Sequence, residues 1–330
     1  MVSEADFRSA AARVRNWGRW GADDEVGTWN LAGPEQVRTS ASEIVTGRVF
    51  PLGSPFDEQG VWGGSSYRRN PLHFMSVDGG DGAELLQRLG EWHFSHSLAS
   101  SSWGRGLMRF NDDYVVMPLQ AASQWDALSH CSYDGVMYNG VPATAVTSAG
   151  ATRLGIETIA RRGIAARGVL VDLPRARGLE HLPPREVVEP EVLDAVLAAQ
   201  GVTLRRGDVL LVRTGWWSAR SAMSGAGWRS SAPGLSWRCG EWLHEREVAA
   251  VAADNLTVEI VELGPDGPEV VLPLHLLCLV EMGMMLGELW WFEDLAADCA
   301  ATGTFTCHLS ASALEVTGAV GSPVNPLAIR

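Results

Sequence analysis

Residues 120–130 have the sequence QAASQWDALSH and directly follow the apolar stretch VVMPL. The apolar stretch predicts a strand. Beyond it, Gln120, Gln124, Asp126 and His130 are spaced by four, two and four residues. Oxygen and imidazole donors at these spacings can converge from a strand end onto one point. The segment therefore predicts the active site of an enzyme.

Two further candidates, His275 and Glu288, lie 13 residues apart in an apolar segment that predicts a helix over residues 274–289. Thirteen residues are about 3.6 helical turns, so the two side chains would point to different sides of a straight helix. They can share a site only if the helix breaks, near Gly283 or Gly287, or if just one of them takes part. A Gln or His in a core segment can also be a structural, hydrogen-bonded residue, so spacing alone leaves that alternative open.

The chain around these segments predicts a mixed α/β core. A helix is expected at residues 190–200, because Pro190 stands at its start and Gly201 just after its end. Helix and strand patterns then alternate along the chain, which is typical of an α/β fold. Further strands are expected at residues 48–52, 168–173, 208–213, 251–254 and 305–309, and further helices at residues 4–16, 150–162, 241–250 and 292–302 and from Pro34 onward.

Two segments predict loops. Residues 60–112 are rich in Gly, Ser and Trp, which favours long loops over the core. Residues 216–240 hold four tryptophans among Ser, Gly, Ala and Pro. Because disordered segments are poor in aromatic residues, we expect this second loop to be a lid or an interface.

Composition places the chain among globular enzymes. Its 330 residues are 46% hydrophobic, which is enough for a sizeable core. The formal net charge of -13 disfavours binding to nucleic acid or to anionic lipid. No repeat or shift in composition marks a boundary, so a single domain over residues 1–330 is expected.

The cysteines and the apolar segments predict a cytoplasmic protein. The five cysteines include no C-x-x-C pair, which argues against a disulfide framework. The start of the chain carries an early acid and no apolar run, unlike a signal peptide. The most apolar stretch, residues 270–289, contains Pro273 and three charged or imidazole side chains, so no membrane span is expected.

The segment of residues 120–130 resembles the signature H-x-G-T-H-x-D-x-P-x-H of the Putative cyclase family, whose relatives include bacterial kynurenine formamidase and isatin hydrolase. Asp126 and His130 match the acid and the last histidine of this signature, while Gln120 and Gln124 stand where its first two histidines would be. The chain is more similar to a longer branch of the family that carries Q-W-D. The stretches that fit this branch are residues 20–28, 124–130, 133–135, 138–140, 253–255, 286–288 and 321–326.

The resemblance implies a fold, a metal site and an assembly. The family fold is a swivelling β/β/α arrangement around a barrel-like mixed β core, assembled as homodimers or homotetramers. Its signature residues and a later His and Glu bind Zn or Mn, and its last histidine transfers protons. Carried onto this chain, the implied metal ligands are Gln124, Asp126, His130, His275 and Glu288, with His130, Asp126 and Glu288 as catalytic residues.

The two glutamines are a departure from the family signature that bears on the metal. An amide oxygen is a weaker and harder donor than an imidazole nitrogen, so Gln120 and Gln124 should weaken Zn binding. Two alternatives follow: the site holds a harder ion such as Mn or Mg, or it works without a metal. Substrate contacts are expected from Gln120, Trp125, Trp62, Trp103, Trp216 and Asn255.

Three functions stay open at this point. The first is metal-dependent hydrolysis of a cyclic or aryl amide or a lactone, with His130 moving the proton. The second is cyclisation or dehydration of a polyketide-like secondary metabolite, in which Asp126 and His130 act on an enolisable carbon without a metal. The third is a non-catalytic binding protein that keeps the pocket only. In each case the expected partner is a small molecule.

Overall fold

The strands expected at residues 168–173 and 208–213 form the centre of a nine-stranded sheet. They are β7 (Ala165–Asp172) and β9 (Val209–Arg213), which pair in parallel. β11 (Ala250–Ala253) and β12 (Met285–Glu288) continue the parallel part of the sheet beyond β9. Every residue of β9, β11 and β12 is buried, as expected for parallel strands covered on both faces.

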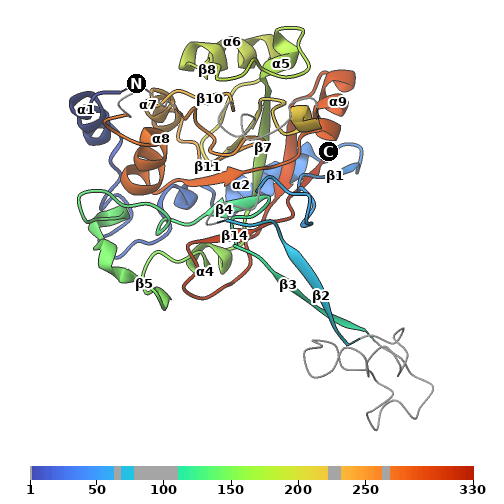
Figure 1. Cartoon of the computed structure of the whole chain (residues 1–330). Helices are drawn as coiled ribbons and strands as arrows, with labels where there is room; N and C mark the ends of the chain where they lie inside the picture. Colours follow the sequence, from blue (N-terminus) through green and yellow to red (C-terminus); the bar gives the residue numbers. More distant parts are fainter. Residues whose placement is uncertain (1, 63–67, 78–110, 222–231, 262–267) are drawn as a thin grey trace, which may run out of the picture. The chain divides into compact units, whose positions relative to one another are not determined.

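Antiparallel strands extend the sheet on both sides. The strand order is β1-β15-β13-β7-β9-β11-β12-β4-β14. The sheet curls into a half-barrel, so the barrel-like mixed α/β core expected from the resemblance is confirmed (Figure 1). The outer strands are β1 (Val49–Pro51), β15 (Leu327–Ile329), β13 (Thr306–Ser310), β4 (Gln124–Asp126) and β14 (Gly321–Pro323).

The computed structural model describes residues 2–62, 68–77, 111–221, 232–261 and 268–330. The chain forms two compact units, one of residues 1–54 and 122–330 and the other of residues 55–121. The large sheet belongs to the first unit, and each unit is described by itself below. The single-domain expectation stays a prediction.

Helices cover the sheet of the first unit. α2 packs on β7, while α1 and α7 pack together with the π-helix η10 (Figure 1). α2 and α6 both begin with a proline, where its missing N–H costs nothing. The helices are α1 (Glu4–Val14), α2 (Pro34–Ser40), α4 (Glu157–Ala160), α5 (Leu173–Ala176), α6 (Pro190–Gln200), α7 (Cys239–Glu245), α8 (Pro273–His275), η10 (Leu276–Met282) and α9 (Glu293–Thr302), with the 3-10 turns η1 (Gly27–Leu31), η2 (Ala41–Glu43), η6 (Tyr138–Gly140), η7 (Ala143–Ala145) and η8 (Ser218–Ser221).

Three expected helices are shorter in the structure. The helix expected at residues 274–289 was wrong beyond Met282, because the chain turns at Gly283 and pairs as β12 between β11 and β4. Residues 150–162 are helical only in α4, because residues 150 and 151 pair as a strand and Leu154 adopts a left-handed backbone with a φ of 62°. The helix expected at residues 241–250 ends at Glu245, and its last expected residue belongs to β11 instead.

Short two-stranded sheets complete the described elements. In the first unit they are β8 (Val187–Val188) with β10 (Gly234–Leu235) and β5 (Val146–Thr147) with β6 (Gly150–Ala151). In the second unit, β2 (Leu72–Val77) pairs antiparallel with β3 (Asp112–Val116), so the expectation of loops alone over residues 60–112 was wrong at β2. Among the described residues, none of the helices has the length and hydrophobicity that a membrane span requires.

Candidate metal and acid–base site

Two neighbouring strands place three polar side chains on one face of the sheet. β4 pairs antiparallel with β12, and Gln124 lies opposite Glu288 in this register. Because side chains alternate along a strand, Gln124, Asp126 and Glu288 project from the same face. The residues between them, Trp125 and Gly287, face the other way.

Close packing on that other face fixes the two strands. The Trp125 indole is fully buried, donates to the carbonyl oxygen of Ala311 at 2.8 Å and packs edge-to-face on Trp290. A Cβ at Gly287 would lie 2.7 Å from the side chain of Ala252 and 2.9 Å from that of Trp125. Only glycine therefore fits opposite Trp125. Because this packing is tight, the backbone that carries Gln124, Asp126 and Glu288 on the polar face is rigid.

His275 reaches the same site because the apolar helix breaks. η10 follows α8 and ends at Gly283, whose φ of 68° is left-handed. The chain then reverses and returns as β12, which brings Glu288 back beside His275. Nε2 of His275 lies 3.3 Å from Oε1 of Glu288. The break near Gly283, one of the conditions for a shared site, is confirmed.

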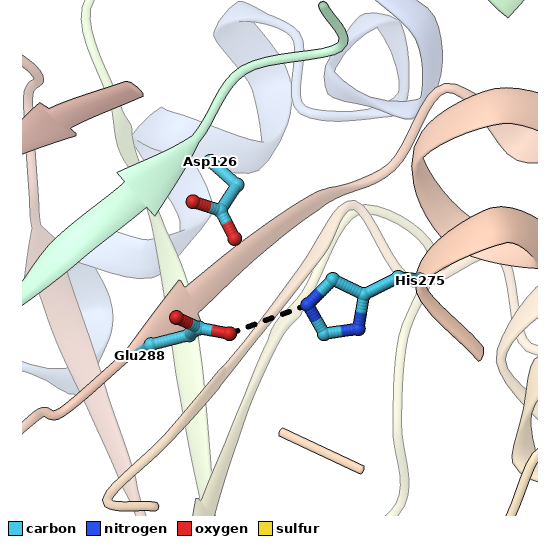
Figure 2. A group of neighbouring side chains, drawn as sticks. All are labelled: Asp126, His275 and Glu288. Carbon is cyan, nitrogen blue, oxygen red and sulfur yellow. Dashed lines mark hydrogen bonds and ion pairs between the residues drawn. The ribbon is translucent and has the colours of Figure 1, made fainter. Parts of the chain in front are cut away.

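Asp126, His275 and Glu288 form a compact buried cluster. One ligand atom from each side chain lies within 4.8 Å of the others, and Figure 2 shows the three side chains pointing toward one another. Gln124 adds a bridge, because its Nε2 donates to Oδ1 of Asp126 at 3.2 Å and to Oε2 of Glu288 at 2.7 Å. The structure thus brings together residues that lie up to 164 positions apart in the chain.

His130 lies at the more open side of this cluster. Its Nε2 is 3.8 Å from Oδ1 of Asp126, and its side chain is 20% exposed where that of Asp126 is 0% exposed. The backbone N–H of His130 donates to the carbonyl oxygen of Ala127, so a tight turn after β4 holds the ring near Asp126. This position suits a group that exchanges protons with a substrate or with solvent.

Glu259 is a member of the site that sequence reasoning missed. Its Oε1 lies 2.6 Å from Nδ1 of His275, and both side chains are almost completely buried. A charged residue in the largely apolar sequence that follows β11 could have drawn attention to Glu259. Its partner His275 lies 16 residues further along the chain, and only the folded structure brings the two side chains together. His275 is therefore held between two carboxylates, Glu259 and Glu288.

The two carboxylates determine the protonation of His275. Burial lowers the pKa of His275, but the hydrogen bonds to Glu259 and Glu288 outweigh it and hold the pKa well above 6.5. Nearby, burial raises the pKa of the Cys131 thiol to about 11. Cys131 therefore stays protonated at neutral pH and does not act as a nucleophile.

The donor set fits a divalent cation. It offers an imidazole nitrogen and carboxylate oxygens, which bind Zn, Mn and related ions. Oδ2 of Asp126 and Oε1 of Gln124 are buried and have no hydrogen-bond donor among the residues that the structure describes. A buried oxygen without a donor is costly, and a cation beside Asp126 would satisfy its Oδ2. Asp126, His275 and Glu288 are the residues best placed to hold it.

Comparison with known families identifies the chain's relatives. Residues 52–260 match the model of the family described as "Putative cyclase". This match covers more than half of the chain and includes β4, β11 and Glu259.

The chain belongs to this cyclase family.

Solved structures of the cyclase family and of isatin hydrolases share the fold. A protein described as a novel cyclase is 38% identical, with a TM-score of 0.82 over 96% of this chain and 99% of that one. The isatin hydrolase A of Labrenzia aggregata, solved with benzyl benzoate, is 15% identical, with a TM-score of 0.57 over 85% of this chain and 93% of that one. An isatin hydrolase bound to the product analogue thioisatinate is 13% identical, with a TM-score of 0.56 over 87% of this chain and 93% of that one. No curated protein matches the chain.

The predicted substrate-binding residues of this cyclase-family chain lie in several places. Trp125 faces the core, away from Asp126, so the structure does not bring its ring to the cluster. Asn255 is buried, and its Nδ2 donates to the carbonyl oxygens of Pro233 and Val258. Its amide therefore braces the loop before Glu259.

For the other residues that were expected to bind substrate, this role stays a prediction. Trp216 is buried just after β9, and its backbone N–H donates to the hydroxyl of Thr214. Gln120 and Trp62 belong to the second unit, where the Trp62 indole donates to the carbonyl oxygen of Ala121. Trp103 and residues 222–231 of the expected lid lie outside the described residues.

Proposed function

We propose that this cyclase-family protein is a divalent-metal-dependent hydrolase that opens a cyclic or aryl amide or a lactone. The observation that carries the proposal is the buried cluster of Asp126, His275 and Glu288, in which Oδ2 of Asp126 has no hydrogen-bond donor among the described residues. The named isatin hydrolases support the substrate class through a shared fold. We also propose that the protein works as a homodimer or homotetramer.

The charge balance of the site favours a bound cation. Asp126, Glu259 and Glu288 are all at least 98% buried, and the imidazole of His275 lies between Glu259 and Glu288. The chain contains no lysine, and within the part that the structure describes no arginine pairs with Asp126 or Glu259. Buried carboxylates need a compensating charge, so a divalent ion is the natural partner of this cluster.

Gln124 can complete the ligand set in place of a histidine. Its amide reaches both carboxylates, and a half-turn of the terminal amide exchanges its nitrogen for its oxygen. The oxygen would then face the position between Asp126 and Glu288. Because an amide oxygen is a hard donor, this set favours Mn or Mg over Zn more than an all-histidine set does.

His130 is the residue that we assign to proton transfer. When bound, a divalent ion supplies Lewis acidity to a carbonyl group and to water. His130, at the open side of the cluster, accepts a proton from the attacking water and returns it to the departing amine or alcohol. The Asp126 carboxylate, 3.8 Å away, stabilises the positive charge that the ring gains.

A test combines metal removal with a panel of simple substrates. The protein, treated with a chelator and then reloaded with Mn²⁺, Zn²⁺ or Mg²⁺, is assayed against isatin, an aryl formamide and an aryl lactone. We expect activity to disappear on chelation and to return with a metal. The variant His130→Ala should bind the metal and lose about 10²–10⁴-fold in turnover. Full hydrolytic activity after complete metal removal would refute the proposal.

One observation favours a second function, metal-independent cyclisation or dehydration. The Gln124 amide nitrogen already bridges Asp126 and Glu288, so part of the cluster is satisfied by hydrogen bonds alone. Asp126 and His130 would then act as acid and base on an enolisable carbon. A protein with this function leaves the simple amides and lactones of the panel untouched and turns over a β-polycarbonyl substrate without metal.

A further inference from the structure

Glu259 makes more contacts than a helix cap needs. Its Oε2 accepts the backbone N–H of Leu274 at 2.9 Å, and its Oε1 accepts the backbone N–H of His275 at 2.8 Å. These contacts satisfy the first N–H groups of α8. The third and shortest contact, 2.6 Å, joins Oε1 to Nδ1 of the His275 ring. The same carboxylate therefore fixes the backbone and the side chain of His275.

The loop that carries Glu259 contains an energetically unfavourable backbone conformation. Val258 has a φ of 56°, a left-handed backbone that is unusual for a β-branched residue. The Glu259 backbone also approaches Gly234 so closely that a Cβ there would lie 2.3 Å from its carbonyl carbon. The Asn255 amide secures the loop by donating to the carbonyl oxygen of Val258. Such backbone strain persists only where the surrounding structure enforces it, and strained residues cluster at active and ligand-binding sites.

We propose that Glu259 is a positioning residue that holds the His275 ring with Nε2 directed at Asp126 and Glu288, an inference that rests on the proposed function. By accepting a hydrogen bond from Nδ1–H, the carboxylate leaves Nε2 as the nitrogen that can bind an ion in the cluster. It also prevents the ring from turning about its side-chain bonds. Histidines that bind metals commonly donate their second N–H to a carboxylate in this way.

A purely structural role for Glu259 makes a different prediction. A cap needs only an acceptor for backbone N–H groups, and its loss lowers stability without changing the cluster. A positioning residue also changes how tightly the cluster binds a metal. The two roles separate when stability and metal affinity are measured in the same variants.

The experiment compares three variants of the full chain with the wild type. Glu259→Leu removes every acceptor, while Glu259→Gln keeps the shape and one acceptor oxygen. Asp254→Asn is the matched control, because Asp254 is equally buried and also accepts two backbone N–H groups and one side-chain donor. Mn²⁺ affinity is measured by electron paramagnetic resonance of the free ion, and the Nδ1 proton of His275 by low-field proton NMR without metal.

We expect Glu259→Leu to weaken Mn²⁺ binding about 10–100-fold and to lose the low-field resonance. Glu259→Gln should recover part of the affinity, and Asp254→Asn should leave both readouts unchanged. A folded Glu259→Leu protein with wild-type affinity and an intact resonance would overturn the inference and leave the proposed function standing. If the wild type binds no Mn²⁺ but its resonance still depends on Glu259, the proposed function falls while the positioning role survives.

Discussion

Gln124 is the residue that we expect to decide which metal the proposed site prefers. Its side chain contacts both carboxylates of the cluster, at a position where the family signature has a histidine. An imidazole there would replace a weak amide donor with a strong nitrogen ligand. The effect of this departure from the signature can therefore be tested by measuring metal affinity.

Replacing Gln124 by histidine should raise Zn²⁺ affinity. We expect Gln124→His to bind Zn²⁺ more tightly by on the order of tenfold, which corresponds to about 1.4 kcal/mol. Competition with a fluorescent zinc chelator measures this change. Gln200→His adds an imidazole in α6 and serves as the control that should leave the affinity unchanged. Equal Zn²⁺ affinity in Gln124→His and the wild type would show that residue 124 does not face the ion.

Asp126 and His130 show how far single residues could be predicted. Both were candidates from their spacing, and the structure places them 3.8 Å apart. Trp125, in the same short segment, was expected to contact substrate but faces the core. Alternation along β4 explains the difference, because a residue next to Asp126 must point away from it.

At the level of elements, the pairing of β4 with β12 sets the distance between Asp126 and Glu288. The pairing depends on Gly287, which leaves room for the Trp125 and Trp290 rings. Packing on the core face thereby controls geometry on the polar face.

Gly287→Ala should therefore disturb both stability and the site. The added methyl group overpacks a full core, which costs about 1–3 kcal/mol. We also expect weaker Mn²⁺ binding, because β12 must move and carries Glu288 with it. Urea unfolding and Mn²⁺ titration measure the two effects. The double variant Gly287→Ala with Ala252→Gly removes the nearest clashing atom and should restore part of both. An unchanged stability in Gly287→Ala would contradict the packing argument.

The contact between α7 and the end of α1 predicts a pH effect. His244 in α7 lies with Nε2 3.2 Å from Oδ1 of Asn16. Burial lowers the pKa of His244 below 6.5, and the nearby Arg19 lowers it further. The unfolded chain thus binds a proton at this group more readily than the folded chain does. Its contribution to stability is present above pH 6.5 and is lost as the pH falls through the lower folded-state pKa.

Comparing the wild type with His244→Gln isolates this contribution. We expect the difference in unfolding free energy between the two proteins to shrink or reverse, in the variant's favour, as the pH falls from 7.5 to 5. Urea unfolding at a series of pH values measures it, and the comparison cancels other titrating groups. A difference that does not change with pH would mean that His244 has the same pKa in the folded and the unfolded chain.

For the whole molecule, the proposed metal links the cluster to the stability of the fold. The cluster joins β4, β12 and the helix break, which lie far apart in the chain, so a ligand there binds only the folded state. At a free metal concentration 100 times the Kd, this linkage adds about 2.7 kcal/mol to the unfolding free energy.

Mn²⁺ should therefore raise the melting temperature by several degrees, and a chelator should reverse the rise. Differential scanning fluorimetry at increasing Mn²⁺ measures the shift. Asp126→Asn should abolish the dependence on Mn²⁺, while Asp254→Asn, a buried carboxylate outside the cluster, should keep it. A Mn²⁺-dependent shift of the same size in Asp126→Asn would place the ion elsewhere.

The sequence alone determined the local features of this protein. The apolar runs of β7 and β9 and the proline and glycine at the ends of α6 were recognisable because they depend on neighbouring residues. The segment from Gln124 to His130 was recognisable for the same reason, since its signature spans a few residues. These features were sufficient to identify the family and one half of the candidate site.

Only the tertiary structure decided the other half. Helix propensity extends the apolar segment to residue 289, but pairing with β4 and β11 turns its last part into β12 and brings Glu288 to His275. Glu259 joins His275 through a loop whose strained backbone no local pattern predicts. Strand pairing and burial act between residues that are distant in the chain, and they determine which side chains meet once the chain has folded.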